Sequence, residues 1–229
     1  MKTFLFAGAS SLIAQETAKL LQAKGHKVIG ISTKSKTYDY NHFYQVDSYD
    51  FGNFPAIEDP IHGMVYFPGT INLKPFHRLK PEEFTTDFSI NTLGAVAFTQ
   101  SYLNNLKGAE SSSIVFISTV AVGVGLPFHT SIAMAKGAIE GLTKALAAEY
   151  APSIRVNCVA PSLVNTPLGE KFLSTPDKIE SMQKRNPMNK VGTATDIANA
   201  ISFLLSDESS WVTGQIMAVD GGMSTLKNG

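Results

Sequence analysis

The sequence predicts an α/β fold in which a doubly wound parallel sheet lies between two layers of helices. Short apolar runs rich in β-branched and aromatic residues recur along the 229-residue chain, without the polar alternation of half-exposed strands. Such runs are typical of strands buried on both faces of a parallel sheet. Helical stretches separate them, and this alternation indicates right-handed crossovers. The expected strands are residues 3–7, 27–32, 63–67, 113–118, 153–159 and 215–219, and the expected helices are 12–24, 81–106, 131–150 and 194–205.

The first helix carries the clearest boundary signals. Leu12, Ala18 and Leu21 fall at roughly helical spacing, and Gly25 stands where a glycine commonly ends a helix. Residues 48–62 are rich in Gly, Pro and Asp and show little helical periodicity, so we expect the crossover helix there to be truncated or absent. No linker or repeat divides the chain, which predicts a single domain spanning residues 1–229.

The composition narrows the class of protein. Apolar residues make up 44% of the chain, and Lys plus Arg equals Asp plus Glu at 19 each. The net field therefore favours neither nucleic acid nor an anionic membrane as a partner. Cys158 is the only cysteine, which fits a reducing compartment and makes a cysteine-based metal site unexpected. No run approaches the ~20 apolar residues of a membrane span. Together with the single cysteine, this leads us to expect a soluble, cytoplasmic protein with no metal.

A glycine turn follows the first expected strand. The segment Ala7-Gly8-Ala9-Ser10-Ser11-Leu12-Ile13 opens the first helix. Free backbone N–H groups and the positive end of a helix dipole make such a turn a natural pyrophosphate site. The alternative is an ordinary strand–helix connection, and Leu12 places a side chain where glycine would allow the closest approach of phosphate.

Several motifs along nearly the whole chain resemble the short-chain dehydrogenase/reductase family. The turn at Gly8 looks like that family's TGxxxGxG motif, and residues 65–69 stand in the place of its NNAG motif. Asn91 matches the asparagine of the central helix, residues 154–166 resemble the IRVNxVxPGxxxT stretch, and residues 219–222 match a C-terminal signature. The resemblance implies a Rossmann-type three-layer α/β/α domain that binds a nicotinamide dinucleotide. It also implies a homodimer or homotetramer.

The resemblance assigns cofactor-binding positions. They are Gly8, Ser10, Ser11, Leu12, Ile13, Ser32, Thr33, Lys34, Asp47, Phe67, Pro68, Gly69, Lys136, Pro161, Ser162, Val164 and Thr166. After the second strand, Ser32-Thr33-Lys34-Ser35-Lys36 contains no acid, and hydroxyls with a lysine favour NADP(H) over NAD(H). The alternative is a solvated loop with lysines by chance. Asp47 stands where the family's aspartate contacts adenine, although it could simply cap a turn.

The family's catalytic tetrad gives an unusual reading in this chain. Lys136 fixes the register, and the family spacing then places Ile132 in the tyrosine position, Thr119 in the serine position and Asn91 in the asparagine position. Residues one helical turn apart share a helix face, which is why the lysine can act on the tyrosine. Thr119 can donate and accept a hydrogen bond, but Ile132 can do neither. His129 is the remaining candidate for a substitute acid, against the alternative of a solvated loop histidine.

Lys136 has two interpretations. It is either a surface lysine on an amphipathic helix, or a buried ammonium that would hydrogen-bond the ribose hydroxyls of a dinucleotide. An unpaired buried ammonium carries a high desolvation cost, which favours the second interpretation. We therefore expect an NADP(H)-dependent oxidoreductase with altered chemistry, and the alternative is an inactive dinucleotide-binding sensor or partner subunit. The apolar wall of Thr119, Val120, Phe128, Ile132 and residues 163–172 favours a lipophilic substrate, and residues 168–187 are expected to form a lid.

Overall fold

A seven-stranded parallel sheet organises the protein, in the order β3-β2-β1-β4-β5-β6-β9. The computed structural model describes residues 1–35 and 38–227, so Lys36 of the expected cofactor loop lies outside the described residues. A separate two-stranded sheet pairs β7 with β8. The strands are β1 (Thr3–Ala7), β2 (Lys27–Ser32), β3 (His42–Gln45), β4 (Gly63–Tyr66), β5 (Ser112–Ile117), β6 (Ile154–Pro161), β7 (Val164–Asn165), β8 (Gly192–Thr193) and β9 (Ile216–Val219).

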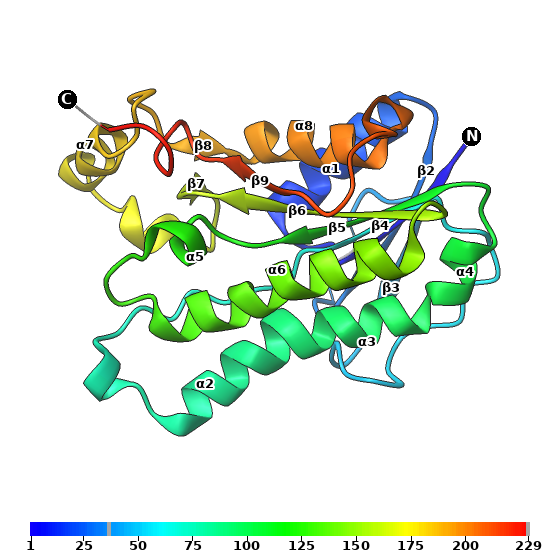
Figure 1. Ribbon diagram of the computed structural model, residues 1–229, viewed down its shortest axis with the longest axis horizontal. Helices are drawn as coiled ribbons and strands as arrows, with labels where there is room; N and C mark the ends of the chain where they lie inside the picture. The colour runs from blue at the N-terminus through cyan, green and yellow to red at the C-terminus, as the bar shows by residue number, and fades with distance from the viewer. Residues whose placement is uncertain (36–37, 228–229) are drawn as a thin grey trace.

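Helices cover both faces of the sheet, as Figure 1 shows. Helices α2, α3 and α6 lie on one face and α1 and α8 on the other. The helices are α1 (Leu12–Ala23), α2 (Pro81–Phe88), α3 (Gly94–Ser101), α4 (Leu103–Lys107), α5 (Ala121–Val124), α6 (Thr130–Tyr150), α7 (Pro176–Lys184) and α8 (Ala194–Leu205). A π-helical turn, Ser89–Leu93, joins α2 to α3. The expected three-layer, doubly wound α/β architecture is confirmed.

The core is double because alternate residues of a strand face opposite sides of the sheet. In β1, Leu5 packs into the cluster under α3 and α6, whereas Phe4 and Phe6 pack into the cluster under α1 and α8. All three side chains are buried. This two-sided burial is why the strand shows a continuous apolar run rather than an alternating pattern.

The structure confirms each expected strand to within two residues, but it adds elements that the pattern did not predict. Edge strand β3 (His42–Gln45) is mostly exposed, so it lacks the apolar run of a central strand. The short elements α5, β7, β8 and α7 were also not expected, and the expected helix 81–106 is divided by the π-helical turn and at Tyr102. Residues 48–62 contain no helix, and Gly25 follows α1 with a φ of 76°, both as expected.

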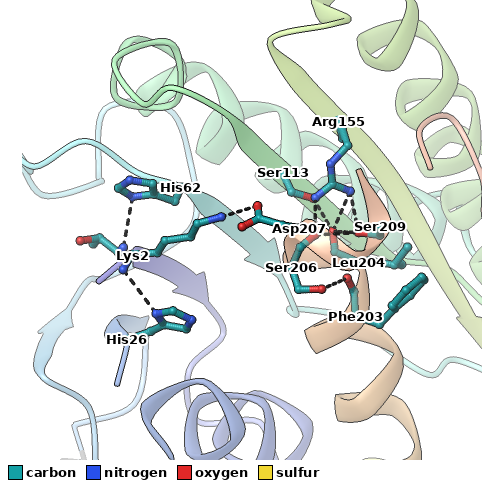
Figure 2. Close-up of polar contacts among 11 residues, drawn as sticks. Lys2, His26, His62, Ser113, Arg155, Phe203, Leu204, Ser206, Asp207 and Ser209 are labelled. Carbon is teal, nitrogen blue, oxygen red and sulfur yellow. Dashed lines mark hydrogen bonds and ion pairs between the residues drawn. The ribbon is translucent and has the colours of Figure 1, made fainter. Parts of the chain in front are cut away.

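Polar contacts stabilise the amino ends of the strands (Figure 2). The rings of His26 and His62 accept hydrogen bonds through Nδ1 from the backbone N–H groups of Lys2 (3.3 Å) and Thr3 (3.2 Å). The Arg155 guanidinium donates to carbonyl oxygens at the end of α8, including Leu204 at 3.0 Å. Carbonyls at a helix end lack intrahelical partners, so this arginine stabilises the packing of α8 on the sheet.

None of the helices in the described chain combines the length and apolarity needed to cross a bilayer. The longest, α6, runs for 21 residues.

Candidate functional site

The candidate site lies at the carboxyl ends of the strands, where the strand order reverses. Strands β1 and β4 are neighbours, and from them the chain proceeds in opposite directions across the sheet. Ligands of doubly wound folds bind at this kind of point. The loops after β1 and β4 touch here: a Cβ added at Gly8 would lie 2.8 Å from Pro68 Cδ. Together with a φ of +72°, this contact leaves room only for glycine.

The glycine turn leads directly into the first turn of α1. Ser11 is the N-cap residue, and no side chain caps its helix. The first N–H groups of a helix have no intrahelical acceptor, so this end presents free donors and the positive end of the helix dipole. Leu12 is 36% exposed and stands beside these donors. Backbone donors and one apolar side chain therefore form this part of the site.

The loop after β2 exposes a cation. Ser32 is buried, and its Oγ accepts a hydrogen bond of 3.0 Å from the backbone N–H of Lys34. The N–H of Thr33 donates to the Tyr49 hydroxyl at 3.3 Å. These two bonds order the loop while the Lys34 side chain stays exposed. Asp47, after β3, is also exposed.

Asn91 sits in the π-helical turn between α2 and α3, fully buried. Its Nδ2 donates to the backbone oxygen of Asp87 at 2.8 Å and to Thr70 Oγ1 at 2.9 Å. The other end of the amide, Oδ1, faces the loop after β4, since a Cβ added at Gly69 would lie 3.1 Å from it. Single π-helical turns inside α-helices occur frequently at functional sites.

Ile132 and Lys136 lie one helical turn apart near the start of α6, and both are buried, at 5% and 6% exposure. A Cβ added at Gly69 would lie 3.4 Å from Lys136 Nζ, so this ammonium and Asn91 Oδ1 flank the same glycine. The side chain of Lys136 makes no hydrogen bond or ion pair with any residue the structure describes. Burial lowers the pKa of Lys136 from 10.5 to about 8. A buried ammonium without a partner is costly, so this one suits a polar ligand.

The other two polar candidates differ in placement. Thr119 follows β5 and is partly exposed; its Oγ1 accepts a 3.3 Å hydrogen bond from the N–H of Ala121, which leaves its hydroxyl proton free to donate. His129 precedes α6, and its Nδ1 lies 2.7 Å from the Pro127 carbonyl oxygen. Because a carbonyl only accepts, Nδ1 carries the proton and Nε2 is the acceptor in the neutral ring. His129 has no hydrogen bond to Asn91, Thr119 or Lys136.

The segment after β6 closes the neighbouring part of the edge. Pro161, the last residue of β6, accepts from the N–H of Val120 at 3.1 Å. Ser162 Oγ donates to the Asp220 carbonyl at 3.3 Å, and Val164 pairs with β8. The expected lid, 168–187, contains a 3-10 turn and α7. A hollow of about 250 Å³ lies beside it, lined by Asn165, Leu173, Ile179, Gln183, Lys190, Val191 and Thr193.

Three polar residues of the site were not anticipated: Thr70, Asp87 and Ser131. Asp87 is buried and accepts hydrogen bonds of 2.6 Å from Thr70 Oγ1 and from Ser131 Oγ. Helical spacing could have indicated Asp87, which stands one turn before Asn91 on the same helix face. Thr70 and Ser131 carry no such signal, because their contacts with Asp87 join segments that are far apart in the chain.

The residues present fit a dinucleotide. A glycine-restricted contact between two loops, an uncapped helix N-terminus and a partnerless buried ammonium lie along the edge where this class of fold binds nucleotides. The geometry therefore defines a Rossmann-type α/β protein.

Comparison with known proteins identifies the family. A family model described as Enoyl-(Acyl carrier protein) reductase matches residues 54–224. L-xylulose reductase of Bos taurus is 32% identical over 231 residues, which cover 95% of this chain and 94% of that protein. A chloroplastic tropinone reductase homologue of Arabidopsis thaliana is 36% identical over 170 residues, 74% of this chain but only 53% of that protein. The chain belongs to the short-chain dehydrogenase/reductase family of oxidoreductases, as its motifs indicated.

A solved structure agrees with this assignment. The ligand-free aldohexose dehydrogenase of Thermoplasma acidophilum superposes with a TM-score of 0.88 at 26% identity, covering 99% of this chain and 95% of that one.

Proposed function

We propose that this protein is an NADP(H)-binding oxidoreductase that reduces a lipophilic small molecule at a site made of Asn91, Thr119, Ile132 and Lys136. The observation that carries the proposal is the Lys136 ammonium, buried beside Gly69 without a partner. A dinucleotide ribose would supply the hydroxyl acceptors that this ammonium lacks. The bound nicotinamide would supply the hydride.

Isoleucine at position 132 limits the chemistry, because its side chain has no proton to give. General acid catalysis contributes about 10²–10⁴-fold, so simple ketones would be reduced slowly. An activated alkene suits the site better: the hydride adds to the β-carbon of an enone, and water protonates the α-carbon. The hydroxyl of Thr119 remains available to hydrogen-bond the substrate oxygen.

The cofactor preference rests on the loop after β2. Its first residues, 33–35, include the exposed Lys34 and no acid, which suits the 2′-phosphate of NADP(H). The two similar proteins compared above are an L-xylulose reductase and a tropinone reductase homologue, which supports the reductive direction. We place this activity in the cytoplasm, because the sole cysteine, Cys158, is a free buried thiol.

We also propose a homodimer or homotetramer. Leu93 on the π-helical turn and Met134 on α6 are 44% and 55% exposed, on two elements that pack together. Large exposed apolar side chains gathered on adjacent elements are typical of an association surface.

The testing experiment is a fluorescence titration of NADPH and NADH on wild-type protein, Lys136→Ala and the control Lys144→Ala. Lys144 lies on the same helix but is exposed. We expect micromolar NADPH binding that Lys136→Ala weakens and Lys144→Ala does not. If neither cofactor binds at millimolar concentration, the oxidoreductase proposal fails and an inactive partner subunit becomes the better account.

A second step separates binding from chemistry. Enones and ketones are screened with wild-type protein and with Ile132→Tyr. We expect enone reduction by the wild type, and ketone reduction that Ile132→Tyr accelerates by about 100-fold or more, since the phenol restores a general acid. Wild-type reduction of ketones as fast as that of Ile132→Tyr would contradict the assignment of position 132.

A further inference from the structure

Asp87 and Lys136 are the two charged side chains that are buried in the described part of the chain. Both belong to the same corner of the molecule. Asp87 lies on α2, one helical turn before Asn91, and Lys136 Nζ flanks the same Gly69 as Asn91 Oδ1. The proposed function gives Lys136 a role but leaves the buried carboxylate unexplained.

Hydroxyl groups satisfy this carboxylate. Thr70 Oγ1 donates to Oδ1 and Ser131 Oγ donates to Oδ2, both at 2.6 Å. No cation pairs with Asp87 among the residues that the structure describes. Distances of this length are characteristic of charge-assisted O–H···O bonds. Burying a carboxylate is costly, so its retention needs a reason beyond helix packing.

The contacts join three segments that carry the site. Thr70 directly follows Gly69 and Ser131 directly precedes Ile132, while Asp87 lies on α2 one turn before Asn91 in the adjoining π-helical turn. We call these four polar residues, Thr70, Asp87, Asn91 and Ser131, the Asp87 cluster. Asp87 belongs to one of these segments and its carboxylate accepts a hydrogen bond from each of the other two, so a change at Asp87 affects all three.

The charge of Asp87 also sets the direction of the hydrogen bonds. A carboxylate only accepts, so the hydroxyl proton of Thr70 points to Asp87 and its oxygen accepts from Asn91 Nδ2. The second Nδ2 proton of Asn91 goes to the backbone oxygen of Asp87, and the N–H of Thr70 donates weakly to Asn91 Oδ1 at 3.4 Å. The Asn91 amide is thereby fixed with its oxygen toward Gly69 and Lys136.

We propose that Asp87 is a positioning residue: through Thr70 and Ser131 it fixes the Asn91 amide, the loop at Gly69 and the start of α6. These are the elements around the nicotinamide end of the site. The inference rests on the proposed function in one respect, namely that its effect on binding is read through NADPH.

The test compares Asp87→Asn, Thr70→Val and Ser131→Ala with Glu82→Gln, a change at an exposed acid of the same helix. Affinities are measured for NADPH and for adenosine 2′,5′-bisphosphate, which lacks the nicotinamide half. We expect Asp87→Asn to weaken NADPH about tenfold and to leave the bisphosphate within about twofold, because hydrogen bonds to a charged group are lost only at one end of the site. Thr70→Val and Ser131→Ala should each produce part of this loss.

A readout without cofactor keeps the inference separate from the proposed function. The side-chain amide of Asn91 is followed by ¹H–¹⁵N NMR in each variant. Asp87→Asn should shift this resonance pair and speed its exchange, whereas Glu82→Gln should not. If Asn91 and NADPH affinity both stay as in the wild type, Asp87 has no positioning role. If the wild type binds no dinucleotide, the proposed function fails, and the Asn91 resonance alone decides the inference.

Discussion

Replacing Lys136 by methionine should make the cofactor-free protein more stable. The ammonium is 6% exposed and has no partner among the described residues. Its pKa is lowered from 10.5 to about 8, which corresponds to about 3 kcal/mol of unfavourable burial of the charge. Methionine keeps the apolar stem and removes the charge, so at pH 7 the free energy of unfolding of Lys136→Met should rise by about 1–3 kcal/mol.

The sign of the pH dependence makes this prediction specific. Between about pH 8 and 10.5 the unfolded chain binds a proton at Lys136 that the folded chain does not, so wild-type stability gains from rising pH in this window. Lys136→Met lacks this gain. Its advantage over the wild type should therefore be full near pH 7 and should vanish near pH 10.5.

Urea denaturation at pH 7, 8.5 and 10 measures the difference. Lys144→Met, at an exposed position of the same helix, should change stability little at any of these pH values. NADPH at 100 times the wild-type Kd should stabilise the wild type by about 2.7 kcal/mol and Lys136→Met by clearly less. A Lys136→Met protein that is less stable at pH 7, or equally shifted at all three pH values, would refute the desolvation argument.

Three further outcomes follow from other parts of the structure. Gly8→Ala should lower the free energy of unfolding by about 2 kcal/mol or more and abolish NADPH binding. Gly25 has a similar φ of +76° but open space around it, so Gly25→Ala should lower the free energy of unfolding, measured by thermal melting, by only about 1 kcal/mol. Lys34→Ala should weaken NADPH about fivefold and leave NADH unchanged in a titration; equal effects on both would exclude contact with the 2′-phosphate. Burial lowers the pKa values of His26 and His62, which accept backbone hydrogen bonds while neutral, so stability should fall as pH drops below about 6.5. In urea denaturation, His62→Gln should lose less stability at low pH than the wild type. The same dependence of stability on pH in both proteins would contradict this assignment.

The fold could be predicted from the sequence because two-sided burial leaves a strong local signal. Strand β1 is apolar from Phe4 to Ala7 since each of these residues faces one of two cores. Strand β3 could not be found in this way, because three of its four residues are exposed at the sheet edge. The absence of a helix in residues 48–62 was predictable, since Gly, Pro and Asp disfavour helix there.

The site was predictable to the extent that its residues share one helix or one loop. Spacing on α6 relates Ile132 to Lys136, and a glycine before a helix indicates an anion site. The contact of Gly8 with Pro68 and the Asp87 cluster join segments far apart in the chain. Such pairings depend on strand order and helix packing, which local patterns do not encode.

The proposed site, with Ile132 one turn before Lys136 and with the buried Asp87, differs from a site with a phenol at position 132 in the groups that stabilise the Lys136 ammonium. A tyrosine beside the lysine would give the ammonium a hydrogen-bond acceptor, whereas isoleucine gives it an apolar neighbour and deepens its desolvation. Asn91 Oδ1 is an acceptor on the described chain that flanks the same glycine as Lys136 Nζ. In the proposed site, which has no phenol, whatever holds that amide in place therefore gains importance. The structure ties the amide to Asp87 through the Asp87 backbone oxygen and, by way of Thr70, through its carboxylate. On this reasoning Asp87→Asn should cost more in the wild type than in Ile132→Tyr, where the phenol again supports the lysine. Additive effects of the two changes on NADPH affinity would show that Ile132 and Asp87 act independently.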